Sequence, residues 1–378
     1  MRMIGQLGEF CLYSDRIEKG ICPERETLKK ENYRSIQGFT FAYGPSAGGL
    51  LESVGIDLDT FGEYISDVKV IPYKIRKVRV KSIIDNSILY IERINGSFSA
   101  SHTISFITAI EEGLGIEPPY EVKIGRIVEM ELERIRNHLI VMQRVVEAAG
   151  FSVPSFQLLY LIEKVNRVIA KSFGHRYFYG VNGLGSLRFY EEIKSLEEIK
   201  KEYKEIYRGI IDNRIFIDRL QSNGVIVDKE GIGPVARSAS FKNDARNDGN
   251  YAEIYKELGF STVTYDEGDA FGRFIVRGEE VEESLRILSS INLHSVEYES
   301  KKRNNEGEGI GRVESPSGDL AYYVKVNENI IKEVYLFAPS SYNILAFSSS
   351  MVKNIFTDFP FNWESFGIWL SEVGVIFE

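Results

Sequence analysis

Cysteine is scarce in this chain: of 378 residues, only Cys11 and Cys22 carry a thiol. Two thiols cannot complete a four-ligand metal site, so we expect this chain to bind no metal or other cofactor by itself. Their number and spacing do not indicate a disulfide framework. We therefore expect two ordinary reduced thiols of a cytosolic protein, with a local disulfide between them as the alternative.

Three further absences each exclude a class of function. No apolar run is long enough to cross a bilayer, and the first residues lack the apolar segment of a signal peptide, so any link to a membrane is expected to be indirect. The net charge is -9 without an obvious basic face, which argues against nucleic-acid binding. Gly183 and Gly185 supply only the first pair of a phosphate-binding Gly-x-Gly-x-x-Gly loop and follow no clear strand, so dinucleotide binding is not expected.

Helical periodicity dominates the middle of the chain, from about residue 85 to 300. In the longest example, 122–149, apolar residues form one stripe at helical spacing, with Pro118 and Pro119 before it and Gly150 after it. The chain is 43% hydrophobic, which is enough to bury one large core or two smaller ones. Further helices are expected at 155–173, 195–222, 279–299 and 342–355.

Alternating apolar residues predict strands on both sides of this helical region. Phe39–Tyr43, Ser53–Asp59 and Tyr64–Val70 are separated by turn-forming residues and predict a small antiparallel sheet. Leu320–Val326 and Ile331–Phe337 flank a short polar turn and predict a hairpin. The glycine-rich stretch 304–311 is expected to be a flexible loop.

These elements predict an α+β fold: a mainly helical core bundle with a small N-terminal antiparallel sheet and a C-terminal β-hairpin. Residues 1–36 match no element that we can place. Residues 37–84 are expected to form the N-terminal antiparallel β region, and residues 85–378 the helical domain.

Short motifs follow one another along most of the chain. Glu92–His102 begins Glu-Arg-Ile-Asn-Gly-Ser-Phe and ends in histidine, and Ser365–Glu372 reads Ser-Phe-Gly-Ile-Trp-Leu-Ser-Glu. Between them lie the motif segments 124–139, 174–185, 233–246, 268–285, 314–318 and 339–343. In this order they resemble the large subunit shared by nickel-iron hydrogenases and respiratory complex I, where it is called the 49 kDa or D subunit. The resemblance is closest to the membrane-bound, energy-converting hydrogenase branch.

All four cysteines that hold the metals in the hydrogenases are missing. The resemblance places them at Asn95, Phe98, Trp369 and Glu372. Nickel-iron chemistry needs soft thiolate ligands, so an active nickel-iron hydrogenase is not expected. Asn95 and Glu372 are suited to a hard cation, but two ligands do not make a cage. We expect Phe98 and Trp369 to fill the former metal cavity as ordinary core.

The resemblance also implies a quinone-like acceptor, because complex I large subunits lack these cysteines too and place a quinone headgroup there. The family's quinone-facing histidine belongs to a loop that is shorter here, Gly44–Gly49, and contains no histidine. The quinone-facing tyrosine is replaced by Gly96. Proton donors would therefore have to come from elsewhere in the chain. No catalytic residue is assigned, and the candidate cavity residues are Asn95, Phe98, His102, Asp244, Arg246, Trp369 and Glu372.

Three positively charged or N–H-bearing positions match residues that, in complex I, lie beside the terminal iron-sulfur cluster of the small subunit. They are Arg76, Arg93 and His138. A positive charge or donor near a cluster raises its reduction potential, because it favours the more negative, reduced state. The resemblance therefore implies an iron-sulfur small subunit as partner, together with other hydrophilic and membrane subunits, at the cytoplasmic face of the cell membrane.

A catalytically silent scaffold subunit of such a complex is the alternative function. Asp244 and Arg246 would then form a leftover ion pair inside a packed core. Ser317 stands where the family's active-site arginine is expected, which favours this alternative.

Overall fold

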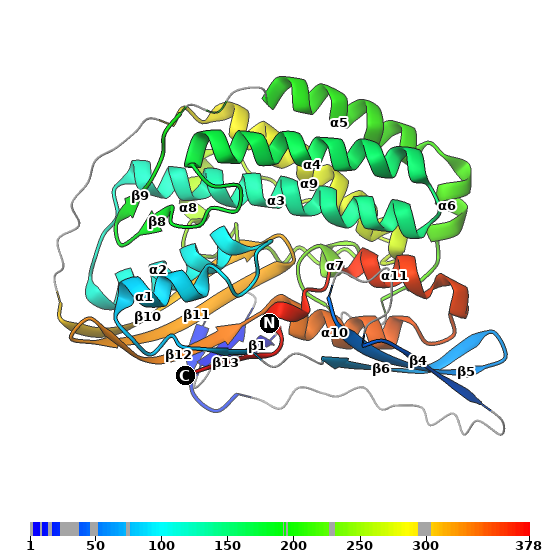
Figure 1. Cartoon of the computed structure of the whole chain (residues 1–378), viewed down its shortest axis with the longest axis horizontal. Helices are drawn as coiled ribbons and strands as arrows, with labels where there is room; N and C mark the ends of the chain where they lie inside the picture. Colours follow the sequence, from blue (N-terminus) through cyan, green and yellow to red (C-terminus); the bar gives the residue numbers. More distant parts are fainter. Residues whose placement is uncertain are drawn as a thin grey trace.

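The computed structural model describes residues 3–7, 10–13, 17–22, 38–45, 52–72, 76–191, 193, 196–226, 231–293 and 304–378. Long helices form one layer of the molecule, and antiparallel strands with shorter helices form the other (Figure 1). The expected α+β class is confirmed, with a helical bundle, an N-terminal antiparallel sheet and a C-terminal hairpin.

Helix α3, Tyr120–Ala148, is the centre of the bundle and packs against α4 (Ser152–Phe173), α9 (Ala270–Ser290) and α11 (Phe359–Phe366). Its boundaries confirm the helix expected at 122–149. Its surroundings differ from the expectation of one apolar stripe, because charged side chains on the other faces are buried as well, among them Arg126, Glu129, Glu131, Glu133, Arg134 and Arg136.

Two predicted helices have different boundaries. The helix expected at 195–222 is divided into α5 (Leu196–Ile211) and α6 (Arg214–Leu220), because the Asn213 side chain accepts hydrogen bonds from the backbone of Ile215 and Phe216 and starts a new helix. Helix α9 begins nine residues earlier than expected, at Ala270, where the Asp269 carboxylate accepts a hydrogen bond from the Gly272 nitrogen. Residues 294–303 lie outside the described part of the chain.

The helix expected at 342–355 is α10, Pro339–Ser350, which starts with proline in its first turn, where the missing N–H costs nothing. The remaining helical elements are short, apart from α2. They are α1 (Ile84–Ile91), α2 (Ser99–Leu114), α7 (Pro234–Arg237), α8 (Ala252–Glu257), η1 (Phe356–Asp358) and η2 (Leu370–Glu372).

The N-terminal sheet has the order β4–β5–β6, with strands Phe39–Tyr43, Val54–Phe61 and Tyr64–Pro72, as expected. The C-terminal hairpin is formed by β11 (Gly318–Asn327) and β12 (Ile330–Phe337). Two minor pairs connect distant or irregular segments. They are β13 (Val375–Phe377) with β7 (Arg76–Val78), in parallel, and β8 (Asn182–Gly183) with β9 (Ser186–Leu187).

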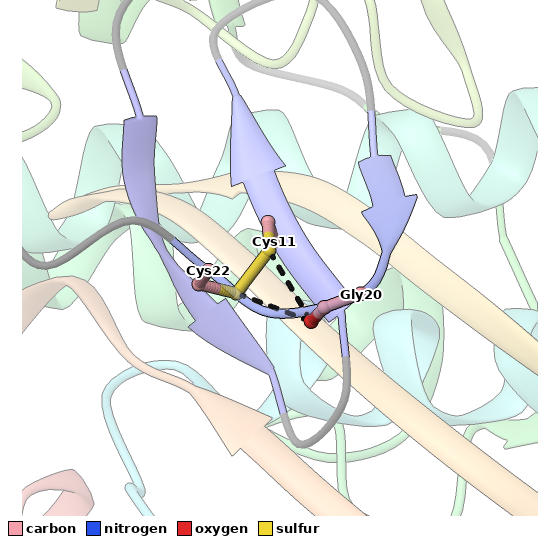
Figure 2. The surroundings of a disulfide bond; sticks show 3 residues. All are labelled: Cys11, Gly20 and Cys22. Carbon is pink, nitrogen blue, oxygen red and sulfur yellow. Dashed lines mark hydrogen bonds between the residues drawn. A yellow bond between two sulfur atoms is a disulfide. The ribbon is translucent and has the colours of Figure 1, made fainter.

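Part of the unplaced segment 1–36 forms a further antiparallel sheet of β1 (Met3–Leu7), β2 (Phe10–Tyr13) and β3 (Ile17–Lys19). Cys11 on β2 and Cys22 after β3 form a disulfide (Figure 2), so the expectation of two reduced thiols is wrong and the alternative is correct. The antiparallel pairing of β2 with β3 brings the two residues together, with their Cα atoms 5.3 Å apart.

The expectation of a flexible loop at 304–311 is also wrong. Residues Glu306–Ser315 form strand β10, which pairs with β11 and packs against helix α2. Gly307, Gly309 and Gly311 alternate along β10, and a Cβ on Gly311 would lie 1.8 Å from the carbonyl oxygen of Ser105 on α2. These glycines therefore allow the strand and the helix backbone to approach one another closely.

We predict that Gly311→Ala lowers the free energy of unfolding by about 3 kcal/mol, because the new methyl group forces β10 away from α2. Gly209→Ala on α5 is the matched control: no heavy atom lies within 4 Å of its added Cβ, and alanine there is expected to stabilise the helix by about 0.5–1 kcal/mol. Urea unfolding of both variants measures the difference. Equal stability of Gly311→Ala and the unmodified protein would contradict the close packing of β10 on α2.

Candidate functional site

The two segments that carry the missing cysteine positions meet inside the molecule. Phe98 directly precedes α2 and Trp369 directly precedes η2. Their rings contact edge to face with centroids 5.6 Å apart. Phe98 is fully buried and Trp369 is 9% exposed. Two of the four former cysteine positions are thus occupied by one aromatic contact, which is the packing expected from the sequence.

His102 and Glu372 form a buried pair next to this aromatic contact. The Nε2 atom of His102 lies 3.2 Å from a Glu372 carboxylate oxygen, and its Nδ1 atom lies 2.7 Å from the Tyr322 hydroxyl. The other carboxylate oxygen of Glu372 accepts a hydrogen bond from the Ser340 hydroxyl. His102 follows Phe98 by one helical turn, and Glu372 follows Trp369 by three residues, so the same two segments supply both pairs.

Asn95 forms a turn before α2, where its side-chain oxygen accepts a hydrogen bond from the Ser97 nitrogen at 3.0 Å. Its amide nitrogen is buried and has no hydrogen-bond partner among the described residues. The indole nitrogen of Trp369 is likewise buried without a described partner. Two former cysteine positions therefore carry N–H groups whose hydrogen-bonding capacity is unused within the described chain.

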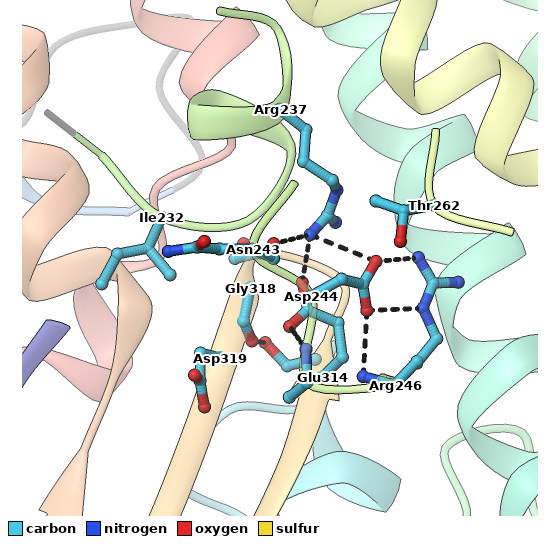
Figure 3. Close-up of polar contacts among 12 residues, drawn as sticks. Ile232, Arg237, Asn243, Asp244, Arg246, Thr262, Glu314, Gly318 and Asp319 are labelled. Atoms are coloured by element: carbon cyan, nitrogen blue, oxygen red, sulfur yellow. Dashed lines mark hydrogen bonds and ion pairs between the residues drawn. The ribbon is translucent and has the colours of Figure 1, made fainter. Parts of the chain in front are cut away.

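Asp244 and Arg246 belong to a separate, fully buried network (Figure 3). Arg246 donates two hydrogen bonds to the Asp244 carboxylate, at 2.9 and 2.7 Å, and Arg237 lies 3.3 Å from it. Burial alone raises the pKa of Asp244, but the two guanidinium groups outweigh burial and leave the pKa below its ordinary value. The hydrogen bonds and ion pairs of Asp244 and Arg246 stay within this network, so they do not connect to His102 or Glu372.

Two further carboxylates complete this network. Arg237 Nη atoms lie 2.7 Å from Glu280 and 2.8 Å from Glu314. Burial and the neighbouring Asp244 charge raise the pKa of Glu314 to about 7. The motifs alone did not single out Arg237, Glu280 and Glu314 as site residues, although all three lie in motif segments or directly beside them.

His138 joins the same network rather than an exposed face. Its Nε2 atom lies 2.7 Å from Glu280 and its Nδ1 atom 3.4 Å from an Arg277 nitrogen, and the side chain is fully buried. Burial is the main cause that lowers the pKa of His138 to about 4, so the ring is neutral at pH 7. Its expected place beside a partner's cluster stays a prediction.

Arg76 and Arg93 lie next to one another, at the surface. Arg76 donates hydrogen bonds to the backbone oxygens of Arg93 and Ile94. The Arg93 guanidinium lies 4.8 Å from the ring centroid of Tyr179 and 3.1 Å from the Glu92 carboxylate, and its side chain is 46% exposed. Tyr179 had no predicted role, because only the folded chain brings its ring to Arg93.

Rings from the segment 174–185 extend this surface, and the buried guanidinium group of Arg136 on α3 packs against one of them. His175 stacks on Tyr179 with centroids 4.7 Å apart, and the Arg136 guanidinium lies 5.1 Å from the centroid of Tyr177. We call Arg93, Arg136, His175, Tyr177 and Tyr179 the arginine–aromatic cluster. Arginine and tyrosine are among the residue types that contribute most often to the energetic centres of protein interfaces.

The residues present do not fit a nickel-iron centre, since the four cysteine positions hold an amide, two aromatic rings and a single carboxylate. Within the described ranges, no three His, Cys, Asp or Glu side chains are arranged to hold a metal ion. Across the same ranges, none of the helices combines the length and apolar composition required to cross a bilayer. The Gly44–Gly49 loop lies largely outside the described residues.

Comparison with known proteins identifies relatives with the same organisation. A family model for the 49 Kd subunit of respiratory-chain NADH dehydrogenase matches residues 163–302. The alpha subunit of the membrane-bound hydrogenase of Pyrococcus furiosus is 30% identical over 320 residues, which cover 75% of this chain and 74% of the relative. The D 2 subunit of the NADH-quinone oxidoreductase of Sorangium cellulosum is 28% identical over 306 residues, covering 74% of this chain and 79% of the relative.

A solved structure has the same fold. A chain of the membrane-bound sulfane sulfur reductase, described as an archaeal respiratory membrane complex, superposes with a TM-score of 0.80 at 19% identity, covering 89% of this chain and 98% of that chain. The fold and the meeting of the two motif segments thus define a large-subunit type of protein. The chain belongs to the family of the respiratory-chain NADH dehydrogenase 49 kDa subunits and the membrane-bound hydrogenase alpha subunits.

We predict that His138→Gln removes a defined part of the pH dependence of stability. The pKa of His138 is about 4 in the folded chain and 6.5 ordinarily, so the unfolded chain binds the proton more tightly and stability falls as the pH falls from 6.5 to 4. This contribution amounts to about 3 kcal/mol. Glu314 has the opposite effect on stability: because its pKa is raised, its contribution to the free energy of unfolding is lost as the pH rises from 4.5 through about 7. The unmodified protein and the His138→Gln variant share this contribution.

The measurement is urea unfolding at a series of pH values between 4 and 7, for the unmodified protein and the variant. His175→Gln is the control, since His175 is partly exposed and has no ion pair within the described chain. Parallel stability curves for His138→Gln and the unmodified protein would show that His138 is not held neutral by burial.

Proposed function

We propose that this chain is the large, 49 kDa-type subunit of a membrane-associated redox complex. In that complex it docks an iron-sulfur small subunit and forms one wall of an electron-acceptor site without a nickel-iron centre. The observation that supports docking most directly is the arginine–aromatic cluster. It contains Arg93, and Arg76 lies next to it. These are two of the positions that, by the family resemblance, lie beside the iron-sulfur cluster of the small subunit.

The chemistry of the arginine–aromatic cluster suits a negatively charged partner group. Arg93 keeps one face on Tyr179 and only one carboxylate, Glu92, pairs with it among the described residues. The guanidinium therefore retains N–H donors for a partner and is held in position by its contact with the ring. A fixed positive charge facing an iron-sulfur cluster stabilises the reduced cluster and raises its potential.

The acceptor site is proposed at the former cysteine positions. The buried N–H groups of Asn95 and Trp369 have no described partner, so an acceptor with oxygen atoms, such as a quinone-like molecule, would satisfy them. Gly96 leaves room for another donor: a Cβ there would lie 3.2 Å from the Tyr179 hydroxyl. Tyr179 thus brings a phenol to the place where the family's tyrosine is missing.

The proposed assembly also implies an indirect link to a membrane. The relatives include subunits named for a membrane-bound hydrogenase and an NADH-quinone oxidoreductase, and the solved relative belongs to a respiratory membrane complex. We therefore propose that this chain is held at the cytoplasmic face of the cell membrane through hydrophilic and membrane partner subunits.

We predict that Arg93→Gln lowers the midpoint potential of the nearest iron-sulfur cluster in the native complex, because a positive charge facing the reduced cluster is lost. Arg286→Gln is the matched control, since the Arg286 side chain is 44% exposed, compared with 46% for Arg93, and pairs with one carboxylate, Glu283. Redox titration followed by electron paramagnetic resonance measures the potential. An unchanged potential in Arg93→Gln, with the small subunit still bound, would exclude the proposed position of the cluster.

The silent scaffold is the second candidate, and the Phe98–Trp369 contact favours it, because two aromatic rings fill space where an acceptor would bind. The Ser317 hydroxyl, at the position of the family's active-site arginine, donates to the Gly367 backbone oxygen at 2.8 Å and so also has a structural partner. In a scaffold, neither group would contact a substrate.

Trp369→Phe separates the two candidates, because it removes the unused N–H and keeps an aromatic ring. If an acceptor binds there, KM for a short-chain quinone reduced by the native complex is expected to rise about fivefold, the effect of one lost hydrogen bond. Trp363→Phe is the matched control, since Trp363 is 6% exposed and packs against Phe347 elsewhere in the core. Unchanged KM in Trp369→Phe would favour the scaffold.

A further inference from the structure

A pocket of about 420 Å³ lies between strands β12 and β13 and reaches Glu372. Its wall is formed by β12, β13, the first turn of α10 and the segment after β7, including Lys81, Glu333, Tyr335, Ser341 and Phe377. The Glu372 side chain itself is fully buried. The pocket therefore leads from the surface near β12 to Glu372, whose carboxyl group lies buried behind the pocket wall.

Burial of the His102–Glu372 pair disfavours a net charge on it. A carboxylate beside a neutral imidazole would leave one negative charge in a fully buried place, and the described residues give Glu372 no arginine or lysine partner. One added proton makes the pair neutral overall, either as imidazolium with carboxylate or as imidazole with carboxylic acid.

The polar groups around the pair support both arrangements. The Ser340 hydroxyl and backbone nitrogen donate to one Glu372 oxygen, which stabilises a carboxylate. In both arrangements Nδ1 of His102 carries a proton and donates it in a hydrogen bond to the Tyr322 hydroxyl oxygen, which accepts. A proton can therefore move between Glu372 and His102 without leaving a buried group unpaired.

A second carboxyl group, that of Glu52, lies close to Glu372. Glu52, just before β5, accepts hydrogen bonds from the backbone nitrogens of Leu370 and Ser371 in η2. Burial raises the pKa of Glu52, and the nearby charge of Glu372 adds to this effect. The remaining charged groups on this side, Lys81 and Glu333, belong to the pocket wall.

We infer that the His102–Glu372 pair is a one-proton store that exchanges with bulk water through the β12–β13 pocket. A proton from bulk water enters through the pocket, binds the buried Glu372 carboxylate and is passed to Nε2 of His102. During turnover the stored proton goes to the reduced, negatively charged acceptor. A new proton then reaches the His102–Glu372 pair from bulk water through the pocket. This role in turnover rests on the proposed function, whereas proton storage and exchange do not.

The test plugs the pocket after the protein has folded. Ser341→Cys introduces a thiol in the pocket wall, and a bulky maleimide is attached to the purified full chain. The native cysteines are joined in a disulfide, so the label reaches only the new thiol. Leu345→Cys, also on α10 but outside the pocket lining, is labelled in the same way as the matched control.

Exchange of imidazole N–H groups with deuterated water is then followed by magnetic resonance of ¹⁵N-histidine. The chain has only four histidines, and His102→Gln assigns the relevant signal. We expect exchange at His102 to slow about tenfold when Ser341→Cys is labelled and to stay unchanged when Leu345→Cys is labelled. His138, buried elsewhere, is the internal control and is expected to respond to neither label.

Absence of slowing in labelled Ser341→Cys, or equal slowing with both labels, would overturn the pocket as the proton path. The role in turnover is tested in the native complex by redox-difference infrared spectroscopy, where we expect a carboxyl band that disappears in Glu372→Gln. A missing band alongside slowed exchange would overturn the role in turnover and leave the store intact. If Arg93→Gln left the potential of the iron-sulfur cluster unchanged while the label at position 341 still slowed exchange at His102, only the proposed docking would be rejected.

Discussion

The buried charged network around α3 is the constraint on which the arrangement of the other elements depends. The network joins four distant parts of the sequence. Its members include His138 on α3, Arg237 on α7, Glu280 on α9 and Glu314 on β10. Glu131 on α3 also belongs to it, because its carboxylate lies 3.7 Å from Arg246. Removing one partner from such a network leaves an uncompensated charge away from water, which typically costs about 3–5 kcal/mol. The network therefore fixes how the helical layer sits on the sheet of β10–β12, and with it the position of α2 and of Phe98.

This network also explains why α3 carries charged side chains on its buried faces. A helix with charges on several faces is usually exposed, because each buried charge needs a partner. Here the partners are supplied by tertiary structure: Arg126 pairs with Glu111 on α2, and Glu133 accepts hydrogen bonds from the first residues of the same helix. The start of α2, which directly follows Phe98, is thus held by a carboxylate of α3.

Elements and contacts with local signals could be predicted from the sequence, and those that depend on distant partners could not. The periodicity of α3 and the alternation in β5 and β6 are local, and both predictions are confirmed. The glycines of β10 suggested a loop, because the α2 backbone that requires them lies far away in the sequence. The motifs likewise predicted that Phe98 and Trp369 fill one space. Tyr179 and Ser340 also lie in motif segments, but no role was predicted for them, because only the folded chain brings them to their partners.

Where the family resemblance places metal-binding thiolates, this chain carries Asn95, Phe98, Trp369 and Glu372, and these side chains suit a different chemistry. Thiolates carry negative charge that a metal neutralises, and without the metal that charge would be buried and unpaired. Two aromatic rings remove the charge at two positions, and an amide does so at a third. At the fourth, Glu372 keeps a carboxyl group, and His102 with a shared proton takes over the neutralising part of the metal. A proton differs from a metal ion in that it can leave and return on the timescale of a redox reaction, so the substitution that ends metal chemistry leaves a group suited to proton transfer.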